Sequence, residues 1–321
     1  MRIIVIGSGN WGTTLAIMFC GRNDVTLWTI DQKEAAIINQ RRENVISLPG
    51  APLPENLVVE AKFTSPVQQD DILVIAIPSR KIEDLAAELH DVPPCIIVNA
   101  SKGVKHTDLS TIREVFARLV PQGRFANLSG PTIARELAEG LPAKAILASD
   151  DIALLFQLQE TLANDLLHYE FSRDVQGIEL CASLKGLIAI AVGLADGFGF
   201  KTNIFGLIMT YGLDEFTRVM EFLGVRTKTV YGIAGMGDLI TTCLSENSRN
   251  RRFGRLLAQG RTTEQALEEV GMEVEGVSMA KTVQKLTKFN LSIPLISCVT
   301  RIIFEQVEDS RAELLNTLMK N

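Results

Sequence analysis

The stretch that decides the fold is Arg2–Gly12, which reads R-I-I-V-I-G-S-G-N-W-G. It opens with an apolar run of strand length, and a helical pattern begins at Trp11. At the junction of the two, Gly7, Gly9 and Gly12 form the pattern G-x-G-x-x-G. Such glycines permit a tight turn, close approach of the backbone to a pyrophosphate and packing of the helix on the strand. The helix start also presents N–H groups to an anion, so the stretch predicts a dinucleotide-binding strand–turn–helix.

An acidic residue stands where the ribose of a dinucleotide would lie. Asp31 follows the second apolar strand pattern, Val25–Trp28. A carboxylate at this place accepts hydrogen bonds from a ribose 2′-hydroxyl and repels a 2′-phosphate, which favours NAD(H). Arg22 and Lys33 are close in sequence, and either could screen a phosphate. The expected cofactor is therefore NAD(H) or NADP(H), with a weak preference for NAD(H).

Strand and helix patterns alternate through the first half of the chain and then give way to helices. The further strand patterns are Asp71–Ile77, Cys95–Ala100, Arg124–Ser129, Ala143–Ser149 and Leu166–Phe171. From about Arg173, helical periodicity dominates, over 174–199, 203–223, 250–258, 263–270, 276–288 and 294–306. Apolar strands that alternate with helices predict a parallel sheet covered on both faces. We expect an α/β fold, with a Rossmann-like, doubly wound parallel-sheet domain (1–172) that binds the dinucleotide. An all-α C-terminal domain (173–321) that binds substrate would follow it.

One segment interrupts the alternation. Residues Glu43–Asn56, E-N-V-I-S-L-P-G-A-P-L-P-E-N, are rich in proline and turn formers, and we expect an ordered loop there.

Composition limits the partners that the chain can have. The 321 residues carry a formal net charge of −6, with a pI near 5.3, which argues against nucleic acid or an anionic membrane surface as a partner. The five cysteines are scattered and form no C-x-x-C pair, and the three histidines show no ligand spacing, so no metal site is expected. The N-terminus shows no signal peptide and no apolar run is long enough to span a bilayer. We expect a cytoplasmic protein without membrane insertion.

A single lysine stands in the most apolar helix pattern. Lys185 is the only charged residue between Glu179 and Asp196. A lysine is almost never fully buried unless it is paired or used. It could form a structural ion pair with one of those two carboxylates, or it could transfer protons. Burial lowers the pKa of a lysine, which suits it to proton transfer near neutral pH.

Two further motifs follow strand patterns. Lys102, in N-A-S-K-G-V, lies just beyond a strand, at the edge where open α/β sheets bind ligands. Gly130, Pro131 and Thr132 lie at a helix start and offer N–H groups and a hydroxyl. A surface turn and ordinary helix capping are the alternative interpretations.

The second half contains an acidic and a basic candidate. Asp238 follows the glycine-rich run G-I-A-G-M-G, and Ser248–Arg252, S-R-N-R-R, forms a compact basic cluster. The planar arginine side chain suits bidentate binding of a phosphate, and Ser248 and Asn250 add neutral hydrogen-bonding groups. A solvated run of charge is the alternative.

Together these stretches resemble one ordered set of motifs. The set is G-S-G-N-W-G, L-P-G-A-P-L-P-E-N-L, S-K-G-V, L-S-G-P-T-I-A-R-E, D-V-Q-G-I-E-L-C-A-S-L-K-G-L-I-A-I-A-V-G-L-A-D-G, G-I-A-G-M-G-D-L-I-T-T-C, S-R-N-R-R-F-G and E-V-E-G-V. It resembles that of the bacterial-type NAD(P)-dependent glycerol-3-phosphate dehydrogenases, over nearly the whole chain and in the same order. The Lys185 helix and the S-R-N-R-R-F-G run are the most family-specific parts.

The resemblance implies an oxidoreductase that interconverts dihydroxyacetone phosphate and sn-glycerol 3-phosphate by reversible hydride transfer and supplies phospholipid synthesis. It implies that Lys185 is the general acid and base, and that Lys102 touches both cofactor and substrate. The implied substrate residues are Lys102, Gly130, Thr132, Lys185, Asp238, Ser248, Arg249 and Asn250. The implied cofactor residues are Gly7, Gly9, Asn10, Trp11, Gly12, Asp31, Lys102, Ala134, Arg249 and Glu275. The partner is then a small phosphorylated substrate, and a homodimer is expected by analogy.

Four positions depart from the family pattern. Gly186 replaces an asparagine after the lysine, Tyr211 an arginine, Ile30 a basic or polar residue and Thr132 a serine. Loss of the asparagine removes a polar group beside the reacting centre, whereas Ile30 supports NAD(H). Two alternatives follow. One is a related dehydrogenase of another phosphorylated or carboxylated hydroxy compound, and the other is a catalytically inactive NAD(P)-binding paralogue.

Overall fold

The computed structural model describes residues 1–62, 64–103, 110–286, 291–305 and 307–320. It divides into two compact units, which we call the sheet unit and the helical unit. The sheet unit comprises Met1–Ser101 and Ile112–Val175, and the helical unit comprises Lys102–Thr111 and Gln176–Asn321. Lys102, which follows a strand in sequence, thus groups with the helical unit. The predicted division of the chain at residues 172–173 stays a prediction.

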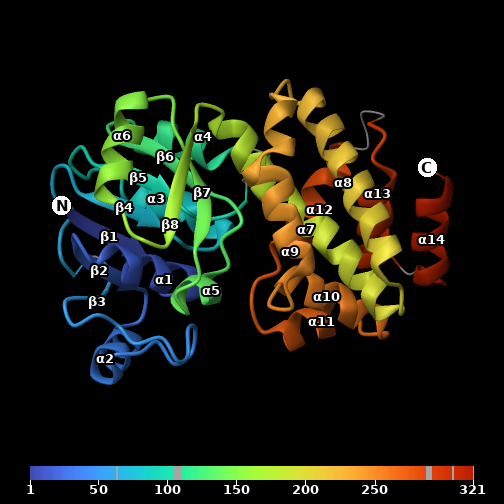
Figure 1. The fold of residues 1–321 in the computed structure, drawn as a ribbon, viewed down its shortest axis with the longest axis horizontal. Helices are drawn as coiled ribbons and strands as arrows, with labels where there is room; N and C mark the ends of the chain where they lie inside the picture. Colours follow the sequence, from blue (N-terminus) through green and yellow to red (C-terminus); the bar gives the residue numbers. More distant parts are fainter. Residues whose placement is uncertain (63, 104–109, 287–290, 306, 321) are drawn as a thin grey trace. The chain divides into compact units, whose positions relative to one another are not determined.

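The sheet unit contains one eight-stranded sheet (Figure 1). Its strands are β1 (Arg2–Ile6), β2 (Asp24–Thr29), β3 (Val58–Ala61), β4 (Ile72–Ile75), β5 (Ile96–Asn99), β6 (Arg124–Ser129), β7 (Ala143–Ala148) and β8 (Leu167–Ser172). They lie in the order β3-β2-β1-β4-β5-β6-β7-β8. The first six follow the Rossmann order, with β1 at the centre, so the predicted fold class is confirmed. The short strand β3 was not predicted.

One pairing differs from the fully parallel sheet that we expected, because β6 and β7 run antiparallel. A parallel connection must cross the face of the sheet and usually does so with a full helix. Between these two strands the chain offers only the short helix α5 (Ala134–Ala138). Strand β7 therefore lies beside β6 and runs in the opposite direction. Strand β8 then pairs with β7 in parallel.

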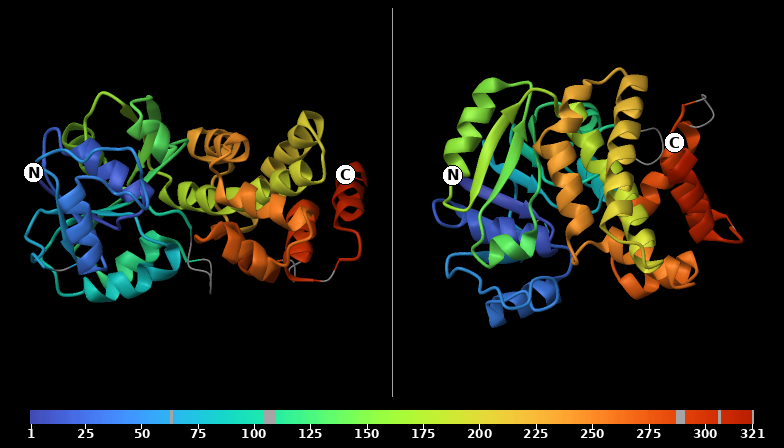
Figure 2. Two further views of the ribbon diagram at one scale, coloured as in Figure 1. Left: turned by 90° about the horizontal axis from the view of Figure 1, so that it is seen from below. Right: turned by 45° about the vertical axis from the view of Figure 1, so that its right-hand side comes forward.

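Helices cover both faces of the sheet, as the alternation predicted (Figures 1 and 2). They include α1 (Asn10–Phe19), α2 (Gln32–Arg41), α3 (Ile82–Glu88), α4 (Ile112–Leu119) and α6 (Ile152–Thr161). Successive residues of β1 point to opposite faces: Ile3 and Val5 pack with Leu15 of α1, whereas Ile4 packs with Phe116 of α4. Apolar packing on both faces therefore fixes the position of β1. It also fixes the start of the glycine turn that follows this strand.

The helical unit is built around one apolar helix, α7 (Val175–Gly197). The other helices of the unit are α8 (Thr202–Phe222), α9 (Asp238–Leu244), α10 (Arg249–Ala258), α11 (Thr263–Val270), α12 (Glu275–Leu286), α13 (Pro294–Phe304) and α14 (Ser310–Lys320), of which α14 packs on α13. In the described part of the chain, α7 alone is long and apolar enough to cross a membrane, but its apolar window is 100% buried in the structure. Such burial is what the core helix of a folded domain requires.

The predicted helical ranges match these helices closely. Residues 287, 288 and 306 of those ranges lie outside the described residues. Helices α9 and α14 were not predicted, and α9 follows a π-helical turn, Ile233–Gly237. The glycine-rich run before Asp238 therefore forms this π-helical turn, and Asp238 begins the helix α9.

Glycines bring α7 and α10 into backbone contact. A Cβ atom on Gly193 would lie 2.0 Å from the carbonyl oxygen of Arg251, and one on Gly254 would lie 2.1 Å from that of Ile190. Neither position admits a side chain at this separation. The close crossing fixes the helix that carries Lys185 against the helix that begins with Arg249.

Glu215 supports the helical core from α8, and its removal should destabilise the protein. This carboxylate is 1% exposed and accepts hydrogen bonds from the backbone N–H groups of Leu295 (2.6 Å) and Ile296 (2.8 Å) at the start of α13. Burial raises its pKa to about 7, although the two bonds favour the charged form. Glu215→Ala leaves both donors unsatisfied, at a cost of about 1–3 kcal/mol each. A thermal scan should show a Tm lower by roughly 5 °C or more.

The matched control for that prediction is Glu221→Ala, an exposed carboxylate on the same helix. It should leave Tm within about 1 °C, because exposed substitutions have small effects. Equal losses from the two variants would contradict the capping role of Glu215.

Candidate active site

The glycine turn after β1 has the geometry of a pyrophosphate cradle. Gly7 adopts φ +116°, and a Cβ there would lie 2.4 Å from the carbonyl oxygen of Ala76. A Cβ on Gly12 would lie 1.9 Å from the carbonyl oxygen of Gly7. Gly9 is the N-cap of α1, makes no side-chain cap, and has no atom within 4 Å of the place of its Cβ. The turn therefore leaves open space in front of the helix N-terminus, which fits the pyrophosphate of a dinucleotide.

Other predicted cofactor residues surround this turn in the sheet unit. The Asn10 carboxamide accepts a hydrogen bond from the N–H of Trp11 (2.8 Å), and the Trp11 indole donates to the carbonyl of Ala100 (3.2 Å), just after β5. The carbonyl of Ala134 accepts from Thr14 of α1 (3.2 Å). The sheet unit thus brings Asn10, Trp11 and Ala134 together beyond the carboxyl ends of β1, β5 and β6.

Asn44 is a residue of this site that sequence reasoning missed. It lies in the predicted Glu43–Asn56 loop, is 1% exposed, and donates to the carbonyl of Ser8 (2.7 Å) and to the hydroxyl of Thr13 (2.9 Å). The loop therefore fastens the glycine turn from outside. In the sequence, Asn44 is simply an asparagine in the proline-rich segment Glu43–Asn56, and nothing else there indicated its role.

Asp31 lies at the end of β2, as expected, but its side chain has a local task. Its carboxylate accepts the N–H of Lys33 (2.7 Å) and so caps the N-terminus of α2. Three residues on, Glu34 is half-buried and accepts hydrogen bonds from Ser8 and Thr29. Sequence reasoning did not single out this second carboxylate.

Gly130 and Thr132 lie just beyond β6, in the sheet unit. Gly130 adopts φ +143°, and the Thr132 hydroxyl donates to its carbonyl (3.3 Å). The remaining predicted substrate residues belong to the helical unit.

Lys185 is buried in the helical unit and pairs with Asp238. Its side chain is 6% exposed and that of Asp238 is 2% exposed, and the lysine donates to the Asp238 Oδ2 atom. Lys102 lies 3.4 Å from the same oxygen. The structure therefore rejects both partners that the sequence suggested for a purely structural ion pair, Glu179 and Asp196, in favour of a carboxylate at the start of α9.

This environment shifts the protonation equilibrium of the lysine. Burial lowers the pKa of Lys185 well below its ordinary value, Asp238 opposes that shift, and the like charge of Lys102 reinforces it. Desolvation also raises the pKa of Glu275, at the start of α12, to about 7, while Arg249, Lys102 and Lys185 lower it. The helical unit thus gathers five of the predicted residues in one electrostatic cluster. Groups of opposite type with pKa values displaced toward neutrality are typical of acid–base sites.

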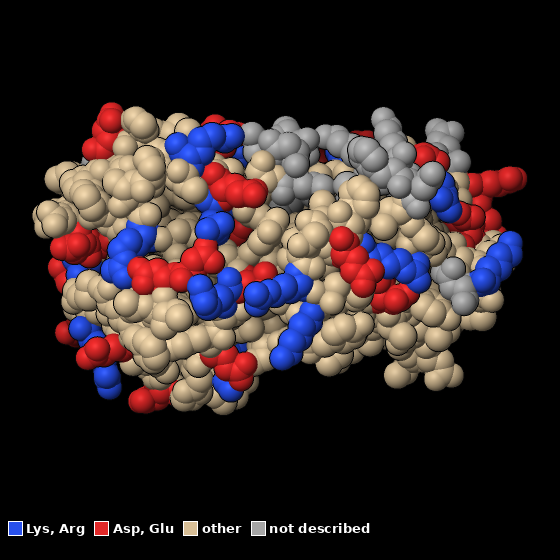
Figure 3. Space-filling view, turned by 90° about the horizontal axis from the view of Figure 1, so that it is seen from above, with Lys and Arg blue, Asp and Glu red and all other residues tan. Residues whose placement is uncertain are grey.

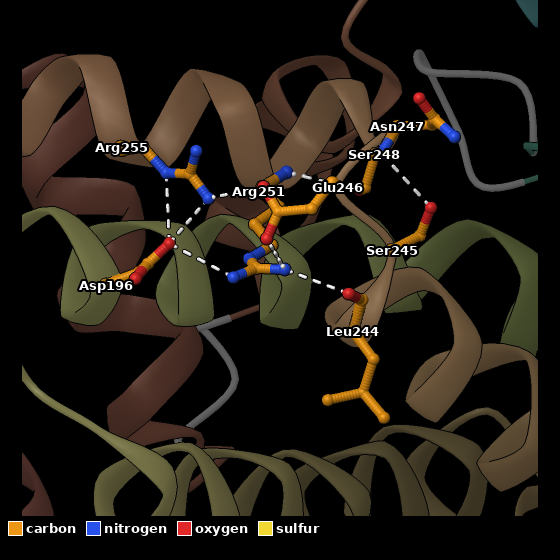
Figure 4. A network of polar contacts seen from close by, with 8 residues as sticks. All are labelled: Asp196, Leu244, Ser245, Glu246, Asn247, Ser248, Arg251 and Arg255. Carbon is orange, nitrogen blue, oxygen red and sulfur yellow. Dashed lines mark hydrogen bonds and ion pairs between the residues drawn. The ribbon is translucent and has the colours of Figure 1, made fainter.

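The arginines of the basic cluster differ in whether they form ion pairs inside the helical unit. Figure 4 shows Arg251 and Arg255 of α10 directed toward Asp196 of α7 (3.1 and 2.6 Å), and Arg251 also donates to the carbonyl of Leu244 (2.9 Å). Glu246 forms ion pairs with both guanidinium groups. This network ties the α9–α10 connection to α7, so these arginines hold structure.

Arg249 differs from its neighbours. Within the residues described, its guanidinium makes no hydrogen bond or ion pair, whereas Arg252 donates to the carbonyl of Glu269 (2.9 Å). Ser248 caps α10 through the N–H of Arg251 (3.3 Å), and the Asn250 oxygen accepts the N–H of Gly276 (3.0 Å). Arg249 at a helix N-terminus is therefore the arginine of this cluster that is placed to receive an anion.

Gly186 has a packing role that explains its small size. A Cβ there would lie 3.0 Å from Cα of Gly276 and 3.3 Å from Nδ2 of Asn250. The glycine lets α7 approach the start of α12, and the Asn250 carboxamide adjoins the same position. Tyr211, another departure, is half-buried on α8 against the apolar core.

Dehydrogenases that use NAD(P) need a turn that receives the dinucleotide and a desolvated group that exchanges protons. The sheet unit of this chain has such a glycine turn and the helical unit has a buried lysine, features that are typical of that class.

Comparison with known proteins identifies the family. Residues 2–155 match the N-terminal model of NAD-dependent glycerol-3-phosphate dehydrogenase, and residues 174–312 match the C-terminal model. The chain therefore belongs to the NAD-dependent glycerol-3-phosphate dehydrogenase family.

Individual relatives agree over almost their whole length. Glycerol-3-phosphate dehydrogenase [NAD(P)+] of Fusobacterium nucleatum is 37% identical, over 99% of this chain and 96% of the relative. That of Halorhodospira halophila is 38% identical, over 94% of this chain and 92% of the relative. The crystal structure of the Coxiella burnetii glycerol-3-phosphate dehydrogenase is 29% identical, with a TM-score of 0.91 over 99% of this chain and 98% of that one.

Proposed function

We propose that this glycerol-3-phosphate dehydrogenase transfers its proton through Lys185 and holds the substrate phosphate with Arg249. The observation that carries the proposal is the buried contact of Lys185 with Asp238, beside Lys102. When bound at the glycine turn, the nicotinamide dinucleotide supplies or accepts the hydride. The chain must then give a proton to the carbonyl oxygen of dihydroxyacetone phosphate, or take one from the C2 hydroxyl of sn-glycerol 3-phosphate.

Lys185 suits that exchange because its surroundings bring its pKa toward neutrality. Its ammonium form acts as the acid in carbonyl reduction, and its neutral form acts as the base in alcohol oxidation. Asp238 holds the ammonium group in place and keeps enough of it protonated. Arg249 and the start of α10 neutralise the phosphate, with Asn250 oriented by the backbone of Gly276.

The pH profile offers a test of the role of Asp238. Its carboxylate raises the pKa of Lys185, so Asp238→Asn should lower that pKa further. Reduction needs the protonated lysine, and kcat/KM for dihydroxyacetone phosphate should therefore begin to fall at a pH about one unit lower than in the wild type. Initial rates measured across pH would show this shift. Glu268→Gln removes an exposed carboxylate from α11 and should leave the profile in place. An unmoved profile in Asp238→Asn would contradict the coupling.

A substrate panel distinguishes the alternatives that the departures raise. NADH consumption should be far faster with dihydroxyacetone phosphate than with dihydroxyacetone or with carboxylated ketones. Preference for another phosphorylated or carboxylated ketone would favour a related dehydrogenase. Binding of NADH without turnover of any phosphorylated ketone would favour an inactive paralogue.

The proposal also covers the cofactor preference, the cellular location, the metabolic role and the oligomeric state. Ile30 and the carboxylates after β2 support a preference for NAD(H). The scattered cysteines support a cytoplasmic location, the family resemblance supports a role in phospholipid synthesis, and analogy with other helical second domains supports a homodimer. On the face drawn in Figure 3, acidic and basic side chains intermingle. That mixture supports a small-molecule partner over a polyanion.

A further inference from the structure

Glu34 lies at the edge of the sheet where a dinucleotide ribose binds. It belongs to the first turn of α2, and its two carboxylate oxygens each lie 3.1 Å from the hydroxyl of Ser8, the second residue of the glycine turn. The hydroxyl of Thr29, the last residue of β2, donates to the same carboxylate. One carboxylate thus spans the carboxyl ends of the adjacent strands β1 and β2.

The position of Glu34 is held from several directions. Ser8 is itself fixed, because Asn44 donates to its carbonyl (2.7 Å) and Gly7 donates its N–H to the carbonyl of Trp28 (2.9 Å). The two hydroxyl donors leave further lone pairs of the carboxylate free, since an ionised carboxylate offers about four. Glu34 is therefore a rigid acceptor with capacity for another hydroxyl.

The charge of Glu34 is not neutralised by a neighbour. In the described part of the chain, hydroxyl groups are its hydrogen-bond partners and no lysine or arginine forms an ion pair with it. Ile30, two residues before the start of α2, is 90% exposed and supplies no compensating charge. Asp31, by contrast, is exposed and occupied with capping α2.

We propose that Glu34, rather than Asp31, is the main residue that selects NAD(H) over NADP(H). The inference rests on the proposed function, since it assumes that a dinucleotide binds at the glycine turn. Glu34 accepts a hydrogen bond from a ribose hydroxyl, whereas the 2′-phosphate of NADP(H) would bring about two negative charges against a fixed carboxylate. Such like-charge contact discriminates strongly where water is partly excluded.

The test measures binding of NADH and NADPH separately by the change in nicotinamide fluorescence, without substrate. The wild type should bind NADH more tightly. Glu34→Gln keeps the shape and the acceptor for Ser8 but removes the charge, and it should tighten NADPH binding by roughly ten- to hundredfold while changing NADH binding by less than about threefold. The gain for NADPH should shrink as salt is added.

Two further variants sharpen the result. Asp31→Asn should change the ratio of the two dissociation constants by less than Glu34→Gln does. Glu160→Gln removes an exposed carboxylate from α6 of the same unit and should leave the ratio unchanged.

Three outcomes would overturn the inference. They are an unchanged ratio in a folded Glu34→Gln protein, a larger change in Asp31→Asn, and equal wild-type affinity for the two dinucleotides. Failure of the proposed function is separate from these, because it appears as absent turnover of dihydroxyacetone phosphate while the binding ratio can still be measured.

Discussion

Replacing Lys185 by methionine should lower kcat for dihydroxyacetone phosphate reduction by about 10²–10⁴-fold. Methionine fills a similar volume in the apolar helix α7 but cannot carry a proton. The buried Asp238 loses its closest cation, yet Lys102 remains 3.4 Å from it and limits the cost of that loss. The glycine turn that receives the dinucleotide belongs to the other unit, so the dissociation constant of NADH should stay within about twofold of the wild type. Steady-state kinetics and NADH fluorescence titration measure the two quantities.

A matched variant separates this effect from general loss of a lysine. Lys228→Met removes an exposed lysine of the same unit and should leave kcat nearly unchanged. Near-normal turnover by Lys185→Met would remove Lys185 from the proton-transfer role.

Arg249→Ala should act mainly on substrate binding. It removes the guanidinium group at the N-terminus of α10, which makes no hydrogen bond or ion pair with any described residue. A charge-assisted, bidentate contact with phosphate contributes about 1.5–3 kcal/mol or more, so KM for dihydroxyacetone phosphate should rise by roughly ten- to a hundredfold. The rate with unphosphorylated dihydroxyacetone, already poor, should change little. The variant should therefore lose most of its preference for the phosphorylated ketone.

The control for that experiment lies in the same helix. Arg252→Ala removes an equal charge from an exposed position that bonds the carbonyl of Glu269, and its KM should stay within about twofold of the wild type. Equal increases in KM for both variants would indicate a general electrostatic effect, and no increase for Arg249→Ala would refute the phosphate site.

Much of the fold could be predicted because its signals are local. The apolar run of β1 and the glycines that follow it define a dinucleotide turn within a dozen residues, and the structure agrees. The antiparallel return of β7 was missed because strand direction depends on what the connecting segment can span. Strand β3 was missed because four residues carry little periodic signal.

The candidate site was predictable in its residues but not in its pairings. Lys185 stood out because a charge in an apolar helix needs a reason. Its actual partner, Asp238, comes from a helix start 53 residues away, and only the tertiary structure brings the two together. The same holds for Arg251, which the sequence grouped with Arg249 as one basic cluster although it is a buried structural contact.

Gly186 shows how context changes the meaning of a departure. In the sequence, Gly186 replaces the asparagine of the family pattern and so removes a polar group beside the reacting centre. In the structure its small size lets α7 approach Gly276, and the carboxamide of Asn250 lies against the same place. The glycine therefore has a packing role inside the helical unit, and a carboxamide lies beside its own position on α7.

The most direct test of the central claim is the initial rate of NADH consumption by the purified wild-type chain on addition of dihydroxyacetone phosphate. The account predicts a fall in NADH absorbance that saturates with substrate, yields sn-glycerol 3-phosphate and is nearly absent with unphosphorylated dihydroxyacetone. A protein that binds NADH but gives no substrate-dependent fall, or that consumes NADH equally fast with both ketones, would contradict it.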